Sequence, residues 1–320
     1  MLMLMSTLSG SPVQFFIYTQ LMSGFAMFQS PPLYAKAISA WMDKDRGIGL
    51  GVGMTGNALG AVIVPPIAGY FLAQYGWRDM RLVNGALVIL IAFPAIYFFI
   101  KEPFAPLAKQ SADQRSANNV PGHSVREGVG TPTFWMLVVS FFLLGAATTA
   151  ALSNMVPLLR DHGFEGAQAA AASILLPALG VGQFVGRFIS GFLLDRYQTA
   201  KIGVVVIFLS FLGVGGLYFG AGVPVFVAGA FFLGLGLGAD LEVAAYYAGR
   251  FFGMKNFGAL YSLIFGPFII GNGVGGFLMG KSRDVFGNYD NGVLGVEIAF
   301  VVACALIMVL PPYVYKRAKR

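Results

Sequence analysis

The chain has 320 residues, of which 57% are hydrophobic and 11% are charged, and its formal net charge is +7. A water-soluble domain carries about a quarter charged residues, so a chain of this composition cannot hide its apolar surface in water. The positive charge does not indicate a nucleic-acid partner, because the Lys and Arg residues are spread between apolar stretches and form no single basic patch.

Nine apolar stretches follow one another along the chain. Several exceed the roughly 18 to 20 residues that cross a ~30 Å hydrocarbon layer as a helix. Helices satisfy their own backbone hydrogen bonds in lipid, and these stretches lack the alternating pattern of a β-barrel. The sequence therefore predicts an all-α, polytopic membrane helix bundle of about nine transmembrane helices. The predicted spans are 12–41, 47–73, 79–100, 133–158, 168–194, 202–220, 223–249, 257–281 and 293–315.

One long polar segment, residues 101–130, separates the third span from the fourth. Its composition predicts a flexible linker between a partial N-terminal helix bundle, 1–100, and a C-terminal six-helix bundle, 131–320. Fourteen Lys and Arg residues lie in one alternate set of connections and five in the other. Because Lys and Arg are retained on the cytoplasmic side, we expect a multi-pass protein of the cell (inner or plasma) membrane with a cytoplasmic linker and C-terminus.

Several kinds of chemistry find no support in the residues. Cys304 is the only cysteine, so no disulfide forms within the chain, and His123 and His162 are too few and too scattered for a metal site. The chain has no phosphate-binding loop ending in Gly-Lys-Ser/Thr and no Ser-His-Asp or Cys-His arrangement. We therefore expect no metal, no cofactor and no enzymatic activity.

An internal repeat relates the second span to the eighth at an offset of 211 residues. Close helix packing explains individual glycines, but it does not explain a shared long-range register. Under this offset three helices of the first half are missing, so we expect a fragment or a late-start form of a twelve-helix protein with two bundles. The glycines Gly47, Gly60, Gly69 and Gly76 superpose on Gly258, Gly271, Gly280 and Gly287.

Four segments carry a resemblance to a known family. They are RGIGLGVGMTGNALGAVIVPPIAGYFLAQYGWR (46–78), TPTFWML (131–137) followed by MVPLLRDHGFEGAQAA (155–170), GRFISGFLLDRYQTAK (186–201) and GLGLGADLEVAAYYAGRFFGMKNFGALYS (234–262). In this order they resemble the major facilitator superfamily, and within it the monocarboxylate-porter and oxalate/formate-antiporter-like branch. The resemblance implies two helix bundles that rock around a midplane site and expose a small organic anion alternately on the two sides.

The family's loop signature, Gly-x-x-x-Asp-Arg-x-Gly, is matched in part. Gly191, Asp195 and Arg196 fit it, whereas Gln198 replaces its second glycine and the first-half copy of the signature is absent. By resemblance these three residues form a gating loop, in which the Asp meets a helix N-terminus in one state and releases it in another. Ordinary helix capping is the alternative.

Arg187 is the best candidate for binding an anion. It lies about eight residues, or ~12 Å of helix rise, inside the cytoplasmic end marked by Asp195. A guanidinium at this depth usually faces a partner or a water-filled cavity, and its fork suits a carboxylate. In similar monocarboxylate porters an arginine at this place is associated with the substrate anion, but their preceding Asp is replaced here by Gln183. The alternative for Arg187 is a stabilising ion pair.

Two carboxylates in the seventh span are candidates for proton coupling or for an ion pair with Arg187. Asp240 and Glu242 stand two residues apart, so they point some 200° from one another and cannot both face one cavity. A carboxylate in a low-dielectric setting holds a proton readily, which suits a proton carrier. A buried pair that fixes helix packing is the alternative. Glu297, near the outer end of the last span, is expected to snorkel to the surface.

Several other polar residues lie within the spans, where they either line a substrate cavity or take part in helix packing. We expect secondary active transport of a small organic anion of the monocarboxylate, oxalate or formate type, as proton symport or anion exchange, by a monomer in a lipid bilayer. A channel would need a continuous polar stripe, and a fragment without three helices could be inactive; both stand as alternatives. The candidate substrate-binding residues besides Arg187 are Gln183, Asn154, Tyr246, Tyr247 and Asn272.

Overall fold

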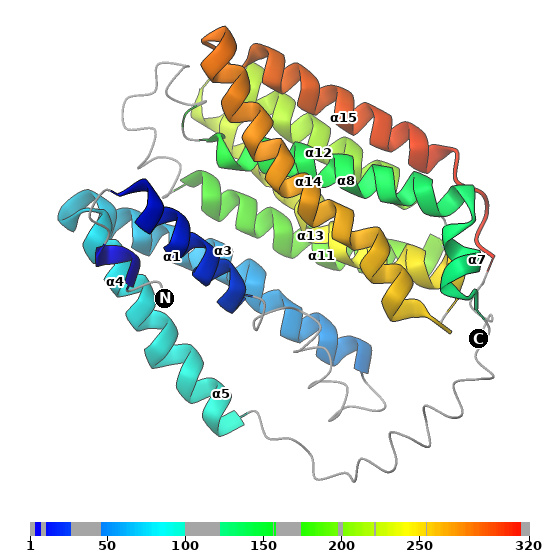
Figure 1. Cartoon of the computed structure of the whole chain (residues 1–320), viewed down its shortest axis with the longest axis horizontal. Helices are drawn as coiled ribbons and strands as arrows, with labels where there is room; N and C mark the ends of the chain where they lie inside the picture. The colour runs from blue at the N-terminus through cyan, green and yellow to red at the C-terminus, as the bar shows by residue number, and fades with distance from the viewer. Residues whose placement is uncertain are drawn as a thin grey trace. The chain divides into compact units, whose positions relative to one another are not determined.

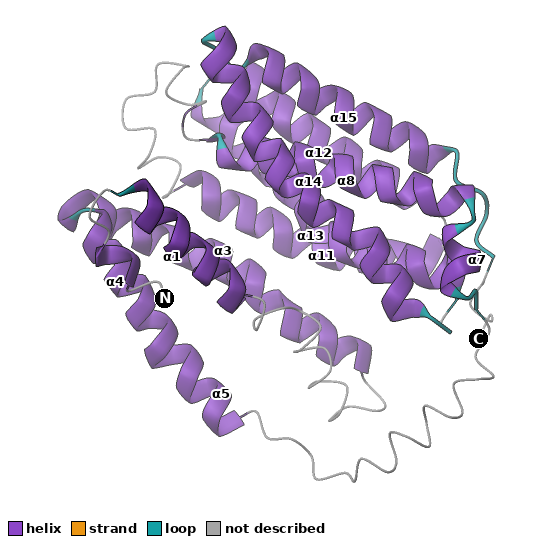
Figure 2. Ribbon diagram, in the orientation of Figure 1, coloured by secondary structure: helices purple, strands orange, loops and turns teal. Residues whose placement is uncertain are grey.

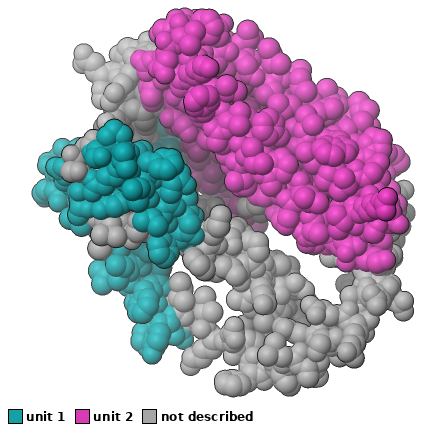
Figure 3. Space-filling view, in the orientation of Figure 1, with its two compact units in different colours: residues 1–106, 168–177 teal, residues 107–167, 178–320 magenta. Residues whose placement is uncertain are grey.

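The computed structural model describes residues 4–7, 11–26, 46–99, 122–155, 157, 174–197, 201–220, 222–253 and 255–314. Helices make up most of these residues (Figure 2), and an isolated antiparallel bridge pairs Gly122 with Gly253. The chain forms two compact units (Figure 3). The first comprises residues 1–106 and 168–177, and the second comprises residues 107–167 and 178–320.

In the first unit, a single glycine separates two long helical runs. Gly76 has φ +86°, a value that residues with a Cβ rarely adopt, and it separates α3 from α4. α4, η3 and α5 follow without a break, so residues 77–99 form one helical run. The elements are η1 (Leu4–Thr7), α1 (Pro12–Ala26), α3 (Arg46–Tyr75), α4 (Trp77–Leu87), the π-helical η3 (Val88–Ala92) and α5 (Phe93–Phe99).

The second unit holds six helices that are long and apolar enough to cross a membrane (Figure 1). A short helix, α7 (Val125–Val129), precedes them. Each of the six overlaps one of the last six predicted spans. They are α8 (Pro132–Ser153), α11 (Leu176–Tyr197), α12 (Lys201–Phe219), α13 (Val223–Phe252), α14 (Phe257–Phe286) and α15 (Asp290–Met308).

The predicted ends of the last two spans were wrong. α15 ends at Met308 and not at residue 315, because Pro311 and Pro312 provide no backbone N–H and disfavour the helical conformation of the residue before them. α14 continues beyond residue 281 to Phe286, where Gly287 with φ +76° ends it in the left-handed conformation. The predicted start of the fifth span, 168–173, lies outside the described residues.

The predicted repeat reappears in the helix boundaries. α3 and α14 each have 30 residues, and the offset of 211 places the ends of one on the ends of the other. Both have proline in the interior, Pro65 and Pro66 in α3 and Pro267 in α14, and a positive-φ glycine follows each helix. The two helices therefore share length, kink-forming residues and a common way of ending.

Within the second unit, the helices approach through glycine and expose apolar side chains outward. α8 packs most extensively against α14 and also contacts α15, while α12 packs against α13 and α15. Large side chains on the outer faces remain exposed, among them Phe188, Ile270 and Phe277. Such a surface suits hydrocarbon and would be unfavourable in water. The unit is therefore a membrane bundle, and the chain is a multi-pass membrane protein.

A substitution in α14 tests the close contact with α8. A Cβ on Gly275 would lie 2.6 Å from Cα of Ala146, whereas nothing lies within 4 Å of a Cβ on Gly273. We expect Gly275→Ala to lower the free energy of unfolding by about 1–3 kcal/mol. The matched Gly273→Ala variant should be neutral or more stable by up to about 1 kcal/mol. Thermal unfolding in detergent measures both, and equal midpoints would contradict the packing described.

The last residues of the predicted linker are structured. The backbone N–H of His123 donates to Phe252 O (2.8 Å), and Asn256 Nδ2 donates to His123 O (3.0 Å), so this segment joins the connection between α13 and α14. Ser124 and Glu127 cap α7 reciprocally. The hydrogen bond from the Ser124 backbone N–H holds the pKa of Glu127 below its usual range. The cap therefore stabilises the folded state above the ordinary pKa of a glutamate and is lost as the pH falls through the lowered value.

Candidate functional site: the crossing of α11 and α13

Four glycines bring α11 and α13 into backbone contact. A Cβ on Gly186 would lie 2.8 Å from the carbonyl carbon of Leu235, and a Cβ on Gly238 would lie 2.8 Å from that of Gln183. Gly182 and Gly234 approach the opposite helix in the same way, at Phe231 and Leu179. Small residues four apart on both helices permit such an approach in a membrane.

The glycine contacts fix the register of the two helices. Gly234 lies against Leu179, and one turn later Gly238 lies against Gln183. The next step of four residues on each helix brings Arg187 level with position 242 of α13. Arg187 is only 8% exposed, and its own carbonyl accepts a hydrogen bond from Ser190 Oγ (3.1 Å). A buried guanidinium thus lies beside the closest approach of the two helices.

Asp240 lies on a different side of α13. It is 5% exposed. Gly236, four residues before it, lies against Ser210 of α12, and Tyr247, seven residues after it, places its hydroxyl against Gly203 of α12. These spacings put Asp240 on the stripe that faces α12. The position of Glu242, about 200° away, is on the stripe that faces α11, although the Glu242 side chain is outside the described part of the structure.

Two of the predicted cavity residues make packing contacts. With its amide nitrogen turned toward the neighbouring acceptors, Asn272 on α14 donates to Gly145 O (3.0 Å) and Thr149 Oγ1 (2.9 Å) on α8. Tyr247 is fully buried between α13 and α12. Gln183 is half-buried, and its backbone takes part in the helix crossing. The structure therefore brings Gln183 near Arg187 in the register, whereas Asn272 joins α14 to α8.

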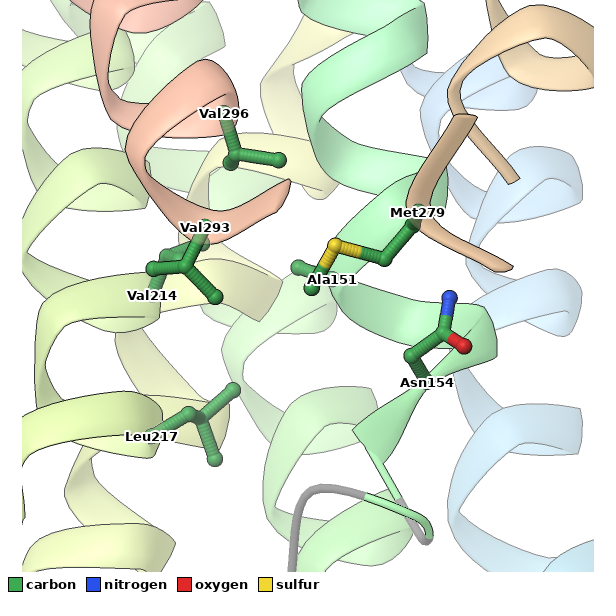
Figure 4. Close-up of a pocket in the computed structure, with 7 residues that line it drawn as sticks. All are labelled: Ala151, Asn154, Val214, Leu217, Met279, Val293 and Val296. Carbon is green, nitrogen blue, oxygen red and sulfur yellow. The ribbon is translucent and has the colours of Figure 1, made fainter. Parts of the chain in front are cut away.

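Asn154, another predicted cavity residue, lines a small hollow at the end of α8 (Figure 4). Its Nδ2 donates to Ala150 O (3.0 Å). The hollow has room for roughly one water molecule, too little for an organic anion. Its other lining residues are apolar: Ala151, Val214, Leu217, Met279, Val293 and Val296.

An aromatic cluster at the end of α13 includes a residue that the sequence analysis missed. The ring of Tyr313 lies 5.0 Å from that of Phe251 and 5.8 Å from that of Tyr246, and burial raises the pKa of its hydroxyl above the usual range. The Arg250 guanidinium lies 4.9 Å from the Tyr246 ring centre. Tyr246 thus takes part in this cluster. The sequence signal for Tyr313 was the Pro-Pro pair before it, which ends α15.

The residues of the predicted gating loop are described only in part. Gly191 and Asp195 lie within α11, and only their backbone belongs to the described part of the structure. Arg196 is exposed, with its guanidinium 5.9 Å from the ring centre of Phe192. Among the described residues, no group of three or more His, Cys, Asp or Glu side chains could hold a metal ion.

Comparisons with known proteins agree with this fold. The E. coli fucose:proton symporter FucP has a TM-score of 0.52 at 18% identity, over 85% of this chain and 70% of that one. Monocarboxylate transporter 13 of Bos taurus is 26% identical over 92% of this chain, and the 4-hydroxybenzoate transporter PcaK of Pseudomonas aeruginosa is 30% identical over 57% of it. The chain spans 66% and 41% of the lengths of these two relatives.

The helical bundle, the apolar outer faces and the similarity to FucP all indicate one fold. The family model described as Major Facilitator Superfamily matches residues 1–239. The match includes all of α11 and the first half of α13. This is a family of transporters and not of enzymes. The chain therefore belongs to the Major Facilitator Superfamily.

Proposed function

We propose that the protein is a secondary transporter of a small organic anion, and that Arg187 binds the carboxylate of that anion. The observation that carries the proposal is the burial of the Arg187 guanidinium, 8% exposed, within an apolar membrane helix. A charge at such a place is costly and marks a substrate or ion pathway more often than a surface feature. The fork of N–H donors suits a carboxylate in particular.

The names of two relatives support the same substrate class. One is a monocarboxylate transporter and the other a 4-hydroxybenzoate transporter, and both names specify a carboxylate. By this proposal a monocarboxylate, oxalate or formate reaches Arg187 alternately from the two sides of the membrane. Gly191, Asp195 and Arg196 form the gate at the end of α11, and the linker and C-terminus face the cytoplasm of a cell membrane.

Glu242 is the proposed proton carrier. It occupies the position on α13 that the register places level with Arg187. When Glu242 is ionised it pairs with Arg187. When it takes up a proton, the guanidinium is released for the substrate carboxylate, so that one proton and one anion move together. Asp240, on the stripe facing α12, serves packing in this account.

Uptake into lipid vesicles tests the function. The purified protein is reconstituted, a pH gradient with an alkaline interior is imposed, and the entry of a labelled monocarboxylate is followed. Proton symport predicts accumulation that disappears when an ionophore collapses the gradient. Anion exchange instead predicts counterflow of the label against internal unlabelled anion without a gradient. Folded protein that gives neither accumulation nor counterflow with monocarboxylates, oxalate or formate would contradict the proposal.

A further inference from the structure

The seam between α12 and α15 contains a buried carboxylate that the proposed transport step does not use. Glu297 lies seven residues after Asp290, the first residue of α15, or ~10 Å of helix rise into an apolar span. Both of its carboxylate oxygens are shielded from the outside and make no hydrogen bond within the described part of the chain. The snorkelling expected from the sequence is therefore wrong for Glu297.

Contacts on one face of α15 locate the carboxylate against α12. A Cβ on Gly215 of α12 would lie 3.8 Å from Oε1 of Glu297. Cys304, seven residues further on and hence on the same face of α15, lies with its Sγ 3.8 Å from Val204 O of α12. The absence of a side chain at Gly215 leaves room for the carboxylate beside the α12 backbone. Glu297 thus points into a helix interface and not toward the membrane surface.

The ionisable groups around this seam are either distant along their helices or bonded to other partners. The Tyr218 hydroxyl donates to Asp290 Oδ1, and Arg283 Nη1 donates to Tyr289 Oη (3.0 Å). α8, which also packs against α15, contributes no ionisable side chain along Pro132–Ser153. The ionisable groups of α12 are Lys201 and Tyr218, those of α14 are Tyr261, Lys281, Arg283 and Asp284, and those of α15 besides Glu297 are Asp290 and Cys304.

An ionised carboxylate without a donor or cation beside it is very costly in such surroundings, and the usual escape is to bind a proton. We infer that Glu297 is a second proton-binding site, separate from the Arg187 crossing, which holds a proton at neutral pH in the membrane and can be modified there by lipid-soluble carbodiimides. The neutral acid fits the interface, whereas the carboxylates of Glu127 and Asp290 are exposed. This inference does not depend on the proposed substrate.

The modification requires the protonated acid. The carboxyl proton moves to one nitrogen of the carbodiimide while the carboxyl oxygen adds to its central carbon, which gives an O-acylisourea. The acyl group then migrates to the second nitrogen, and a stable N-acylurea results. Nothing leaves in either step, so the modified peptide gains the full mass of the reagent. An ionised carboxylate at the same pH does not start this sequence.

The test is labelling of the protein in lipid vesicles at pH 7 with a lipid-soluble carbodiimide, followed by mass spectrometry of its peptides. We expect an adduct at Glu297, none on Glu127 or Asp290, and none at position 297 in the Glu297→Gln variant. Labelling should fall as the pH is raised. A Glu297 that stays unlabelled in vesicles, but is labelled after the same protein is unfolded in acidic detergent, would overturn the inference.

The pH dependence of stability is an independent test of the inference, and it also shows whether the Glu297→Gln variant folds. Because the native state holds a proton that the unfolded chain releases at neutral pH, wild-type stability should decline as the pH rises. Glu297→Gln copies the neutral acid and has no proton to release, so it should match the wild-type midpoint below the ordinary pKa of a glutamate and exceed it at neutral pH. A Gln variant that unfolds at a much lower temperature at pH 7 would show instead that Glu297 is ionised and paired.

Discussion

Replacing Arg187 by glutamine should reduce carboxylate uptake into vesicles roughly tenfold to hundredfold. Glutamine keeps the hydrogen-bonding capacity but removes the charge, and hydrogen bonds to charged groups contribute about 1.5–3 kcal/mol. Because the side chain is only 8% exposed beside the α11–α13 crossing, its charge interacts more strongly with an anion than the charge of a surface arginine would. Arg187→Lys should recover only part of the uptake, because an ammonium lacks the planar fork.

The matched control is Arg126→Gln. Arg126 is an exposed arginine on α7, outside the membrane helices, and its substitution should leave uptake at the wild-type level. Thermal unfolding of each variant separates a loss of binding from a loss of folding. Undiminished uptake by a folded Arg187→Gln protein would assign Arg187 to helix packing alone.

The second large effect concerns the partner of Arg187. The contacts of Leu179 with Gly234 and of Gln183 with Gly238 place position 242, and not 240, level with Arg187. Removing one member of a buried ion pair costs about 3–5 kcal/mol, since the other charge is left uncompensated. Glu242→Gln should therefore lower the free energy of unfolding by about that amount, and combining it with Arg187→Gln should cost much less than the sum of the single changes.

Asp240→Asn provides the comparison. Its stripe faces α12, so its effect on stability should add to that of Arg187→Gln without coupling. The double-mutant cycles are measured by chemical unfolding in detergent, and the pH dependence of uptake is measured for the same proteins. Coupling of Arg187 to Asp240, or pH-dependent uptake that survives Glu242→Gln, would assign the pair and the proton to the other carboxylate.

The positions of the membrane helices were largely predictable, because the length of a hydrocarbon span and its flanking charges are local features of the sequence. The starts of α12, α13 and α14 fall within one residue of the predicted starts. The end of α15 was mispredicted because apolar residues continue past Met308, and the effect of the following Pro-Pro pair was not weighed.

The candidate site was predictable only in part. The sequence indicated a deep Arg187 and two carboxylates on opposite faces of one helix. It could not indicate which carboxylate lies level with the arginine, because that depends on which glycine of α11 meets which glycine of α13. The burial of Glu297 was likewise hidden, because it depends on the packing of α15 against α12, where Gly215 leaves room for the carboxylate.

The most direct test of the account is whether the protein recognises the charge of its ligand. Equilibrium binding to the purified protein in lipid nanodiscs is measured for a series of small carboxylates and for their uncharged amides of the same size. Recognition by a buried guanidinium predicts that carboxylates bind at least about tenfold more tightly than their amides. Equal binding of acid and amide would contradict the assignment of Arg187 as the anion-binding residue.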